Sequence, residues 1–391
     1  MGNLLHKVIA GWGASALVAV VLAATPAAAQ SAGAASPPQS SSQHDAAAQL
    51  PGDQQHDYPT LHIAGFGDID FSQTKHLEGP RGFSLGQFVL HMTSELSPRV
   101  TFFGEISFTA RADAGTGNPA ATGFNAEIER MILRFDESDR FKVSFGRYHT
   151  PINYWNTAFH HGQWLQTTIA RPEMIQFGGR FLPVHFVGAL AEGGVPAGGW
   201  NLNYQAGFGN GRGSVISRAG DAGDNNDFRA TLLTMFSKPD QLYGFQFGGS
   251  IYFDKITLLD ARDFGERIVA GYAVWQKETP ELIAEVAAVR HEPTEGSLVT
   301  WSHAYYIQAA YRLPQLNHAL KPYFRFEHVG VNPQDVVFQV QSVPNLDDGV
   351  TLGLRFDASQ FAALKGEYRT WSRGGSTPRN YGGFFQICFT F

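Results

Sequence analysis

Two adjacent histidines are the side chains in this sequence whose type best suits metal binding or proton transfer. They are His160 and His161, in the segment AFHHGQW. Adjacent side chains point apart on most backbones, and no Cys or carboxylate stands near these two at the spacing of a zinc motif. We therefore interpret them as loop residues without a ligand role, and we expect no metal site and no cofactor.

Other catalytic signatures are missing from the sequence. It contains no GxSxG, HExxH or GxxxxGK[ST] motif, and GFGNGRG at 207–213 lacks the spacing of a dinucleotide-binding fingerprint. A single cysteine, Cys388, excludes an internal disulfide and a zinc site built on several thiolates. The net charge of -6 provides no broad basic face for nucleic acid. We expect no enzyme and no nucleic-acid partner, with an unidentified hydrolase as the alternative.

The charged residues fall on segments whose apolar and polar positions alternate. In 99–112, Phe102 and Ile106 share one face of a strand, whereas Glu105 and Arg111 share the other. Segments of roughly ten residues suit a tilted strand that crosses a bilayer, whereas the strands of a soluble sandwich are near five or six residues. No uncharged apolar run of spanning length follows residue 61. Any membrane insertion must therefore be by strands.

Sixteen such segments can be placed between residues 61 and 391, and the connections after even-numbered segments are mostly the shorter ones. This alternation is typical of a barrel whose short turns lie in the periplasm and whose longer loops face outward. We predict an all-β, transmembrane antiparallel barrel of about 16 strands over 61–391, with 14 or 18 strands as alternatives.

The first sixty residues have a different composition. Lys7, an uncharged run and the alanines before residue 30 indicate a signal peptide over 1–29, with an uncleaved membrane anchor as the alternative. Residues 30–60 are rich in Ala, Ser, Gln and Pro and almost without aromatics, which is typical of a disordered leader.

The last strand ends in an aromatic residue and has apolar residues at alternate positions before it. These residues are Tyr381, Phe385, Ile387, Phe389 and Phe391. Over 61–391 the chain resembles Gram-negative outer-membrane porins, and within them FKVSFGRYHTPINYW is similar to a G-[QR]-x-x-x-P turn of the phosphate-selective O/P type, through Gly146, Arg147 and Pro151. The resemblance implies an outer-membrane location, contact with lipid, a homotrimer, and an assembly signal in the last strand that the outer-membrane assembly machinery reads.

The resemblance also implies a function. We expect passive diffusion of small hydrophilic solutes or ions through a water-filled barrel that is narrowed by a loop after the fifth strand. The candidate constriction loop is 151–180, and its polar and aromatic candidates are His160, His161, Trp164, Arg171 and Glu173. Two alternatives are a loop that packs as an aromatic lid over the barrel mouth or against a neighbouring subunit, and a non-conducting barrel that serves attachment or surface recognition.

Charged residues on the polar strand faces are the candidate pore lining, because Arg or Lys facing lipid at mid-depth would cost about 2–4 kcal/mol. The candidates are Asp68, Asp70, Glu95, Glu105, Glu127, Glu129, Arg312, Arg325, Arg355, Lys365, Glu367 and Arg369. We interpret Arg325, Lys365 and Arg369 as an anion-attracting ladder. The alternative is that the charges pair across strands and fill a plugged barrel. Strict alternation directs Arg130, Arg134 and Arg147 outward, which conflicts with this placement.

Overall fold

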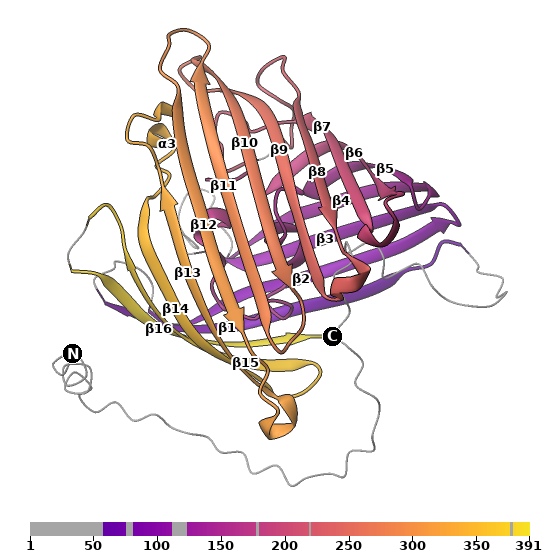
Figure 1. Ribbon diagram of the computed structural model, residues 1–391, viewed down its shortest axis with the longest axis vertical. Helices are drawn as coiled ribbons and strands as arrows, with labels where there is room; N and C mark the ends of the chain where they lie inside the picture. Colours follow the sequence, from indigo (N-terminus) through magenta and orange to yellow (C-terminus); the bar gives the residue numbers. More distant parts are fainter. Residues whose placement is uncertain (1–57, 76–80, 112–122, 177–179, 219, 376–377) are drawn as a thin grey trace. The chain divides into compact units, whose positions relative to one another are not determined.

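The chain forms a closed antiparallel barrel of sixteen strands in the computed structural model, which describes residues 58–75, 81–111, 123–176, 180–218, 220–375 and 378–391. Every strand pairs with its neighbours in sequence, and β1 closes the barrel against β16 (Figure 1). This confirms the predicted fold class and strand number. The predicted signal peptide, and the predicted leader up to residue 57, lie outside the described residues.

The strands are long, as a tilted membrane crossing requires. They are β1 His62–Lys75, β2 Gly82–Ser97, β3 Val100–Ala110, β4 Phe124–Ser138, β5 Phe141–His149, β6 His185–Val195, β7 Leu202–Asn210, β8 Ala230–Ser237, β9 Phe245–Thr257, β10 Asp263–Trp275, β11 Glu281–Pro293, β12 Thr300–Ala310, β13 Leu320–Gly330, β14 Leu346–Asp357, β15 Ala362–Ser372 and β16 Asn380–Thr390.

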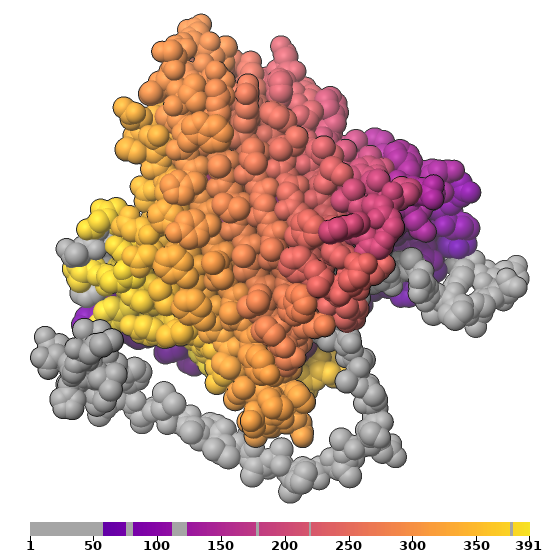
Figure 2. All heavy atoms as spheres, viewed as in Figure 1, coloured from indigo at the N-terminus to yellow at the C-terminus, as the bar shows by residue number. Residues whose placement is uncertain are grey.

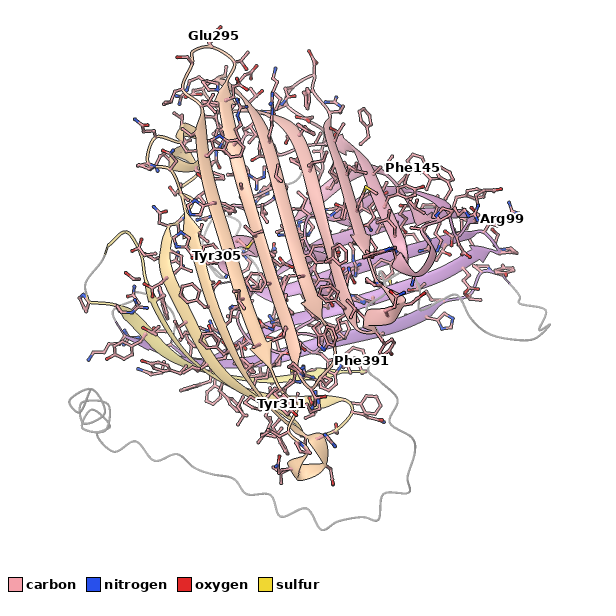
Figure 3. The ribbon with its side chains drawn as sticks, viewed as in Figure 1. Arg99, Phe145, Glu295, Tyr305, Tyr311 and Phe391 are labelled. Carbon is pink, nitrogen blue, oxygen red and sulfur yellow. The ribbon has the colours of Figure 1, made fainter. Side chains whose placement is uncertain are left out.

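Short helices lie in the connections. The long connection between β5 and β6 carries α2, Trp155–Phe159, and η2, Glu173–Ile175, and the connection between β13 and β14 carries α3, Val336–Val340. At the opposite end, η3 Gly198–Trp200, η4 Asp240–Leu242 and η5 Gln315–His318 lie in turns that follow even-numbered strands. In Figure 3, Glu295 marks the end of the long loops, and Tyr311 and Phe391 lie toward the other end.

The outward face of the wall is apolar. Phe145 and Ile128 are 59% and 55% exposed. On β16, Phe385 and Ile387 also face outward, whereas the next residue, Cys388, is buried. Successive strands form a continuous surface in Figure 2. None of the helices in the described residues is long and apolar enough to cross a membrane. Large apolar side chains outside and charges inside reverse the pattern of a water-soluble domain, and they fit a wall that contacts lipid.

A bulge in β4 resolves the conflict over the arginines of that strand. Glu105 pairs with Arg130, and the next residue of β3 pairs with Ile128, so Glu129 is an extra residue in β4. A bulge changes which side chains point inward beyond it. Arg130 and Arg134 are therefore buried inside the barrel, and the outward placement from strict alternation is wrong for both.

The conflict at Arg147 has a related cause. Arg147 forms the last pair of the β4–β5 ladder, opposite Met131. Gly146 before it adopts φ +145°, where a Cβ would collide with the Met131 carbonyl oxygen. The Arg147 guanidinium is buried and contacts Glu127, Glu129 and Asp221, so its outward placement is also wrong.

The C-terminal residue closes the barrel. Phe391 N–H donates to the Gly65 carbonyl, and Gly65 N–H donates to the Phe391 carbonyl. The ring of Phe391 stacks on Phe88 with 5.9 Å between centroids, and a Cβ at Gly65 would collide with it. The terminal aromatic therefore packs on the outer wall where the last strand meets the first.

Candidate functional site: a loop held inside the barrel

The connection between β5 and β6, residues 150–184, forms the candidate site, and we call it the inward loop. At its base Thr150 N–H donates to the Val184 carbonyl. The Asn156 amide donates to the carbonyls of both Thr150 and Val184, at 2.9 Å each, which ties α2 to the base. Trp155 and Ile175 are almost fully buried. The described part of the loop over 150–176 therefore lies within the barrel, between its walls.

Three wall cations hold carbonyl groups of the loop. Lys365 Nζ donates to the carbonyls of Gln163, Gln166 and Thr168, the last two at 2.9 and 3.2 Å. Arg325 donates to the carbonyls of Ala170 and Arg171 at 2.8 and 3.0 Å. Arg355 donates to those of Trp164 and Gln166 at 2.8 and 2.9 Å. Buried carbonyls need such partners, so these cations fix segment 163–171.

Wall carboxylates hold N–H groups of the same loop. Glu285 Oε1 accepts from Tyr154 N–H at 3.0 Å and from Trp155 N–H at 2.6 Å. Glu367 Oε1 accepts from Ile169 N–H, and Glu327 Oε2 accepts from Glu173 N–H, both at 2.6 Å. Charges of both signs on β11, β13, β14 and β15 are thus used to position the loop.

These contacts correct the interpretation of the basic residues as an exposed ladder. Arg325 and Lys365 face inward, but they are 0% and 1% exposed because the loop covers them. Arg369 contacts Glu367 and lies over the Phe384 ring, with its side chain 22% exposed. Of these three cations, only Arg369 keeps contact with solvent.

The remaining predicted lining residues fall into separate groups. On β1, Asp68 and Asp70 both lie near the Gln386 amide. Arg312, just after the C-terminal end of β12, pairs with Glu278 and with Asp357 at the C-terminal end of β14. Glu95 lies half-buried near the end of β2. The structure therefore does not bring all twelve candidates to one constriction.

Three candidates in the loop make specific contacts. The Trp164 ring lies 5.1 Å from the Arg355 guanidinium, and Arg171 lies 5.2 Å from the Trp155 ring. Glu173 pairs with Arg373 at 2.8 Å. Burial lowers the pKa of Arg171 to about 9 and raises the pKa of Glu173.

His160 and His161 lie in a buried cluster with Glu129, His149 and His185, in which one ligand-type atom from each residue lies within 4.8 Å of all the others. His149 and His185 face each other across the β5–β6 ladder, and Glu129 is the bulge residue of β4. Burial holds the pKa of His160 well below its ordinary range, and the neighbouring His149 adds to this.

Sequence spacing did not reveal this cluster, nor the role of Glu285. Glu129 lies on the predicted polar face of its strand, but the folded loop brings His160 and His161 beside it, and the cross-strand pair of His149 and His185 is set by register. The available signal was that His149 lies next to the end of one predicted strand, 141–150, and His185 lies near the start of the next, 181–193.

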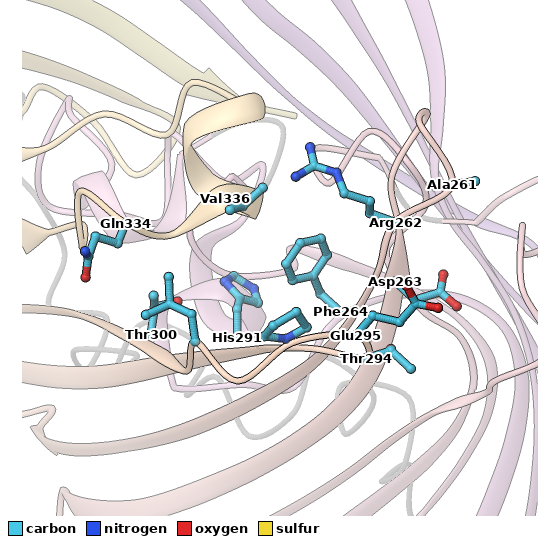
Figure 4. A pocket seen from close by; sticks show the side chains of 12 residues that line it. Ala261, Arg262, Asp263, Phe264, His291, Thr294, Glu295, Thr300, Gln334 and Val336 are labelled. Atoms are coloured by element: carbon cyan, nitrogen blue, oxygen red, sulfur yellow. The ribbon is translucent and has the colours of Figure 1, made fainter.

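A separate cavity of about 400 Å³ lies among the outer loops, lined by residues that include Phe264, His291 and Val336 (Figure 4). His291 Nδ1 lies 2.8 Å from Asp335, and Nε2 lies 3.1 Å from Glu266. Both ring nitrogens therefore already have carboxylate partners, and these contacts fasten α3 to the wall.

Comparison with known proteins establishes the fold. No protein-family model matches the chain, and no curated protein matches its sequence. The outer membrane channel DcaP of Acinetobacter baumannii has a TM-score of 0.58 at 11% identity, covering 88% of this chain and 100% of that chain. OmpF of Salmonella typhi, in complex with daunomycin, has a TM-score of 0.56 at 13% identity, covering 85% and 97%. OmpT of Vibrio cholerae, an outer membrane protein in a trimer form, has a TM-score of 0.53 at 12% identity, covering 86% and 100%.

Identities this low show the fold alone. The chain has the fold of a Gram-negative outer-membrane barrel, and its apolar outer face suits that location. The comparisons give no support to the phosphate-selective O/P type.

Proposed function

We propose that this chain is an outer-membrane channel through which small hydrophilic solutes or ions diffuse passively, with the inward loop as its constriction. The observation that carries the proposal is the set of wall charges that hold the loop backbone inside the barrel. Sixteen strands enclose more space than wall side chains fill. A loop fixed across that space suits a filter that reduces the bore.

The solvent exposure of two charged side chains supports the same proposal. The Glu127 side chain is 46% exposed and the Arg369 side chain is 22% exposed, although each belongs to an inward-facing set. Charged groups that are not covered by the loop keep water and ions favourable in the lumen. The channel would work by sieving and by the field of these charges, without a catalytic step.

Selectivity would be weak on this account. The loop covers Arg325 and Lys365 and engages Glu285 and Glu367, so charges of both signs are withdrawn from the lumen. We propose no phosphate preference. We also propose a homotrimer, which the trimer form of the Vibrio cholerae neighbour supports.

Liposome swelling tests the proposal. Purified protein in proteoliposomes should admit small sugars such as arabinose and exclude larger ones such as stachyose. A variant lacking residues 159–171, with both flanking strands intact, should admit the larger sugars as well. Swelling at the level of empty liposomes for both proteins, with the barrel shown to be folded, would reject a channel and favour the non-conducting alternative.

A further inference from the structure

We propose that Glu129, His149, His160, His161 and His185 form a binding site for one divalent transition-metal ion of the Zn²⁺ class. His185 has a side chain that is 11% exposed and the other four residues are buried, and one ligand-type atom from each of the five lies within 4.8 Å of all the others. The site joins the inward loop to β4, β5 and β6. The proposal concerns binding and does not depend on the proposed channel function.

The donor set suits this class of ion. Neutral imidazole nitrogens bind Zn²⁺, Ni²⁺ and Cu²⁺ well, whereas Mg²⁺ and Ca²⁺ prefer sites made of oxygen ligands. Four imidazoles and one carboxylate suit a metal ion of intermediate softness such as Zn²⁺. Three or four of these side chains would act as ligands, and water would complete the coordination shell. The rings are close, since the His149 and His160 centroids lie 4.1 Å apart and those of His160 and His161 lie 4.4 Å apart.

The spacing is near that of a coordination shell. Two nitrogen ligands on one Zn²⁺ ion lie roughly 3.3 Å apart in a tetrahedral site and roughly 4.2 Å apart when opposite one another. Glu129 Oε2 already lies 3.0 Å from His161 Nε2 and 2.9 Å from His185 Nε2. All five ligand-type atoms lie within 4.8 Å of one another. This limit exceeds the spacing of opposite ligands by roughly 0.6 Å and the tetrahedral spacing by roughly 1.5 Å. Side-chain shifts of about an ångström would therefore close the shell.

The side chain of Asn156 orients the His160 ring. Its Nδ1 lies 2.7 Å from Asn156 Oδ1. The Asn156 amide nitrogen already donates to the carbonyls of Thr150 and Val184, so Oδ1 is the atom that faces the ring and accepts from it. His160 therefore carries its proton on Nδ1 and the lone pair on Nε2, which is the tautomer that binds metal through Nε2.

A comparable contact serves His161. Gln87 Nε2 lies 3.1 Å from His161 Nδ1, and Gln87 Oε1 is buried without a hydrogen-bond partner among the described residues. The two ends of an amide exchange by a half-turn of the side chain. That turn would place Oε1 against an Nδ1–H group, satisfy the oxygen, and leave the lone pair on Nε2, which faces Glu129.

Nearby charged side chains compete with a metal ion for Glu129 and set which charge the site favours. Arg147 contacts Glu129 at 3.4 Å but also has Glu127 at 3.0 Å and Asp221 at 2.8 Å, so it keeps two partners if Glu129 binds metal. Glu105 is paired with Arg130 and lies 3.5 Å from His149 Nε2. Arg171 is the other buried cation close to the cluster. These arginines disfavour a dication and would favour an anion, so the experiment must separate the two occupants.

Metal binding to the folded full-length barrel in detergent tests the site. After dialysis against Zn²⁺ and removal of free ion, we expect one Zn²⁺ per chain by elemental analysis. Co²⁺ should give the visible d–d bands of a four- or five-coordinate site. Mg²⁺ at the same concentration should not compete. Because the ligands must be deprotonated, Zn²⁺ affinity should fall as the pH is lowered.

Two variants remove proposed metal ligands and replace them with amide side chains of similar size. Glu129→Gln and the double variant His160→Asn/His161→Gln should each weaken Zn²⁺ binding by at least roughly 10- to 100-fold, which is the loss typical when a residue that hydrogen-bonds a metal ligand is removed. The matched control is His303→Gln/His328→Gln, a pair of neighbouring rings 5.2 Å apart on β12 and β13, outside the cluster. This control should bind Zn²⁺ like the parent.

Folding of each variant is checked by the change in electrophoretic mobility on heating. Equal Zn²⁺ stoichiometry in the parent and in both folded ligand variants would overturn the proposal, as would no retained Zn²⁺ and no Co²⁺ bands in the parent. Thermal stabilisation of the parent by inorganic phosphate, without retained Zn²⁺, would also overturn it and assign the cluster to an anion.

Discussion

Lys365 offers the sharpest test of how the inward loop is held. In the parent its Nζ donates to three loop carbonyls, and one of these, on Gln166, also receives a hydrogen bond from Arg355. Lys365→Met therefore removes a donor from the carbonyls of Gln163 and Thr168 while roughly keeping the buried volume. A hydrogen bond to a charged group contributes about 1.5–3 kcal/mol.

The magnitude follows from these two carbonyls. The variant loses the hydrogen bonds to both carbonyls, but it no longer buries an ammonium group, which offsets part of that loss. We therefore expect the free energy that holds the loop against the wall to fall by about 3 kcal/mol. That corresponds to a roughly 100-fold larger population of the released loop, since each 1.4 kcal/mol is tenfold. The barrel itself should stay closed, because the strand ladders do not use the Lys365 side chain.

Chymotrypsin digestion of the folded barrel measures the population of molecules in which the loop is released. Phe159 and Trp164 are cleavage sites within the loop, and the cleavage rate tracks the open population when the loop opens and closes rapidly. We expect cleavage at these residues to be roughly 100-fold faster in Lys365→Met than in the parent. Arg134→Gln is the matched control, because it neutralises another buried interior cation, which pairs with Asp136 and not with the loop. Equal loop cleavage in the parent and in folded Lys365→Met would refute the idea that Lys365 holds the loop.

Three further changes test other parts of the account. Deletion of Phe391, or Phe391→Ser, should lower the yield of heat-modifiable protein in outer-membrane fractions, because the residue both closes β16 on β1 and ends the proposed assembly signal; normal yield would separate the aromatic terminus from assembly. Gly146→Ala should reduce folded yield, because its Cβ would collide with the Met131 carbonyl oxygen at a positive φ, at a cost of more than about 1–3 kcal/mol, whereas Gly366→Ala has open space and should fold normally. Glu285→Ala should speed chymotrypsin cleavage after Tyr154, because two buried N–H groups at the start of α2 lose their acceptor; an unchanged rate would show that Glu285 does not hold α2.

The barrel could be predicted from the sequence because its signals are periodic. Alternation over long segments gave the lipid-facing side and a count of sixteen strands, which the structure confirms. The alternating lengths of the connections supported the barrel. Strict alternation failed at Arg130 and Arg134, because one extra residue, Glu129, shifts the facing of β4. A bulge of this kind leaves little trace in the pattern of residue types.

The partners of individual charges were harder to predict. Lys365 and Arg325 were expected to line water, but a loop that is 199 and 155 residues away in sequence, respectively, supplies their acceptors. The histidine cluster depends on contacts between distant segments, since the β5–β6 register sets His149 opposite His185 and the inward loop brings His160 and His161 beside Glu129. Pairing between distant segments is a property of the three-dimensional fold, and a single sequence does not encode it as a local pattern.

Planar-bilayer recording of the purified parent beside the variant that lacks residues 159–171 measures the proposed constriction most directly. We expect stable conductance steps for the parent and larger steps for the variant, because the loop that the wall charges hold narrows the lumen. The absence of steps from both folded proteins would contradict a channel. Steps of the same size from both would contradict the inward loop as its constriction.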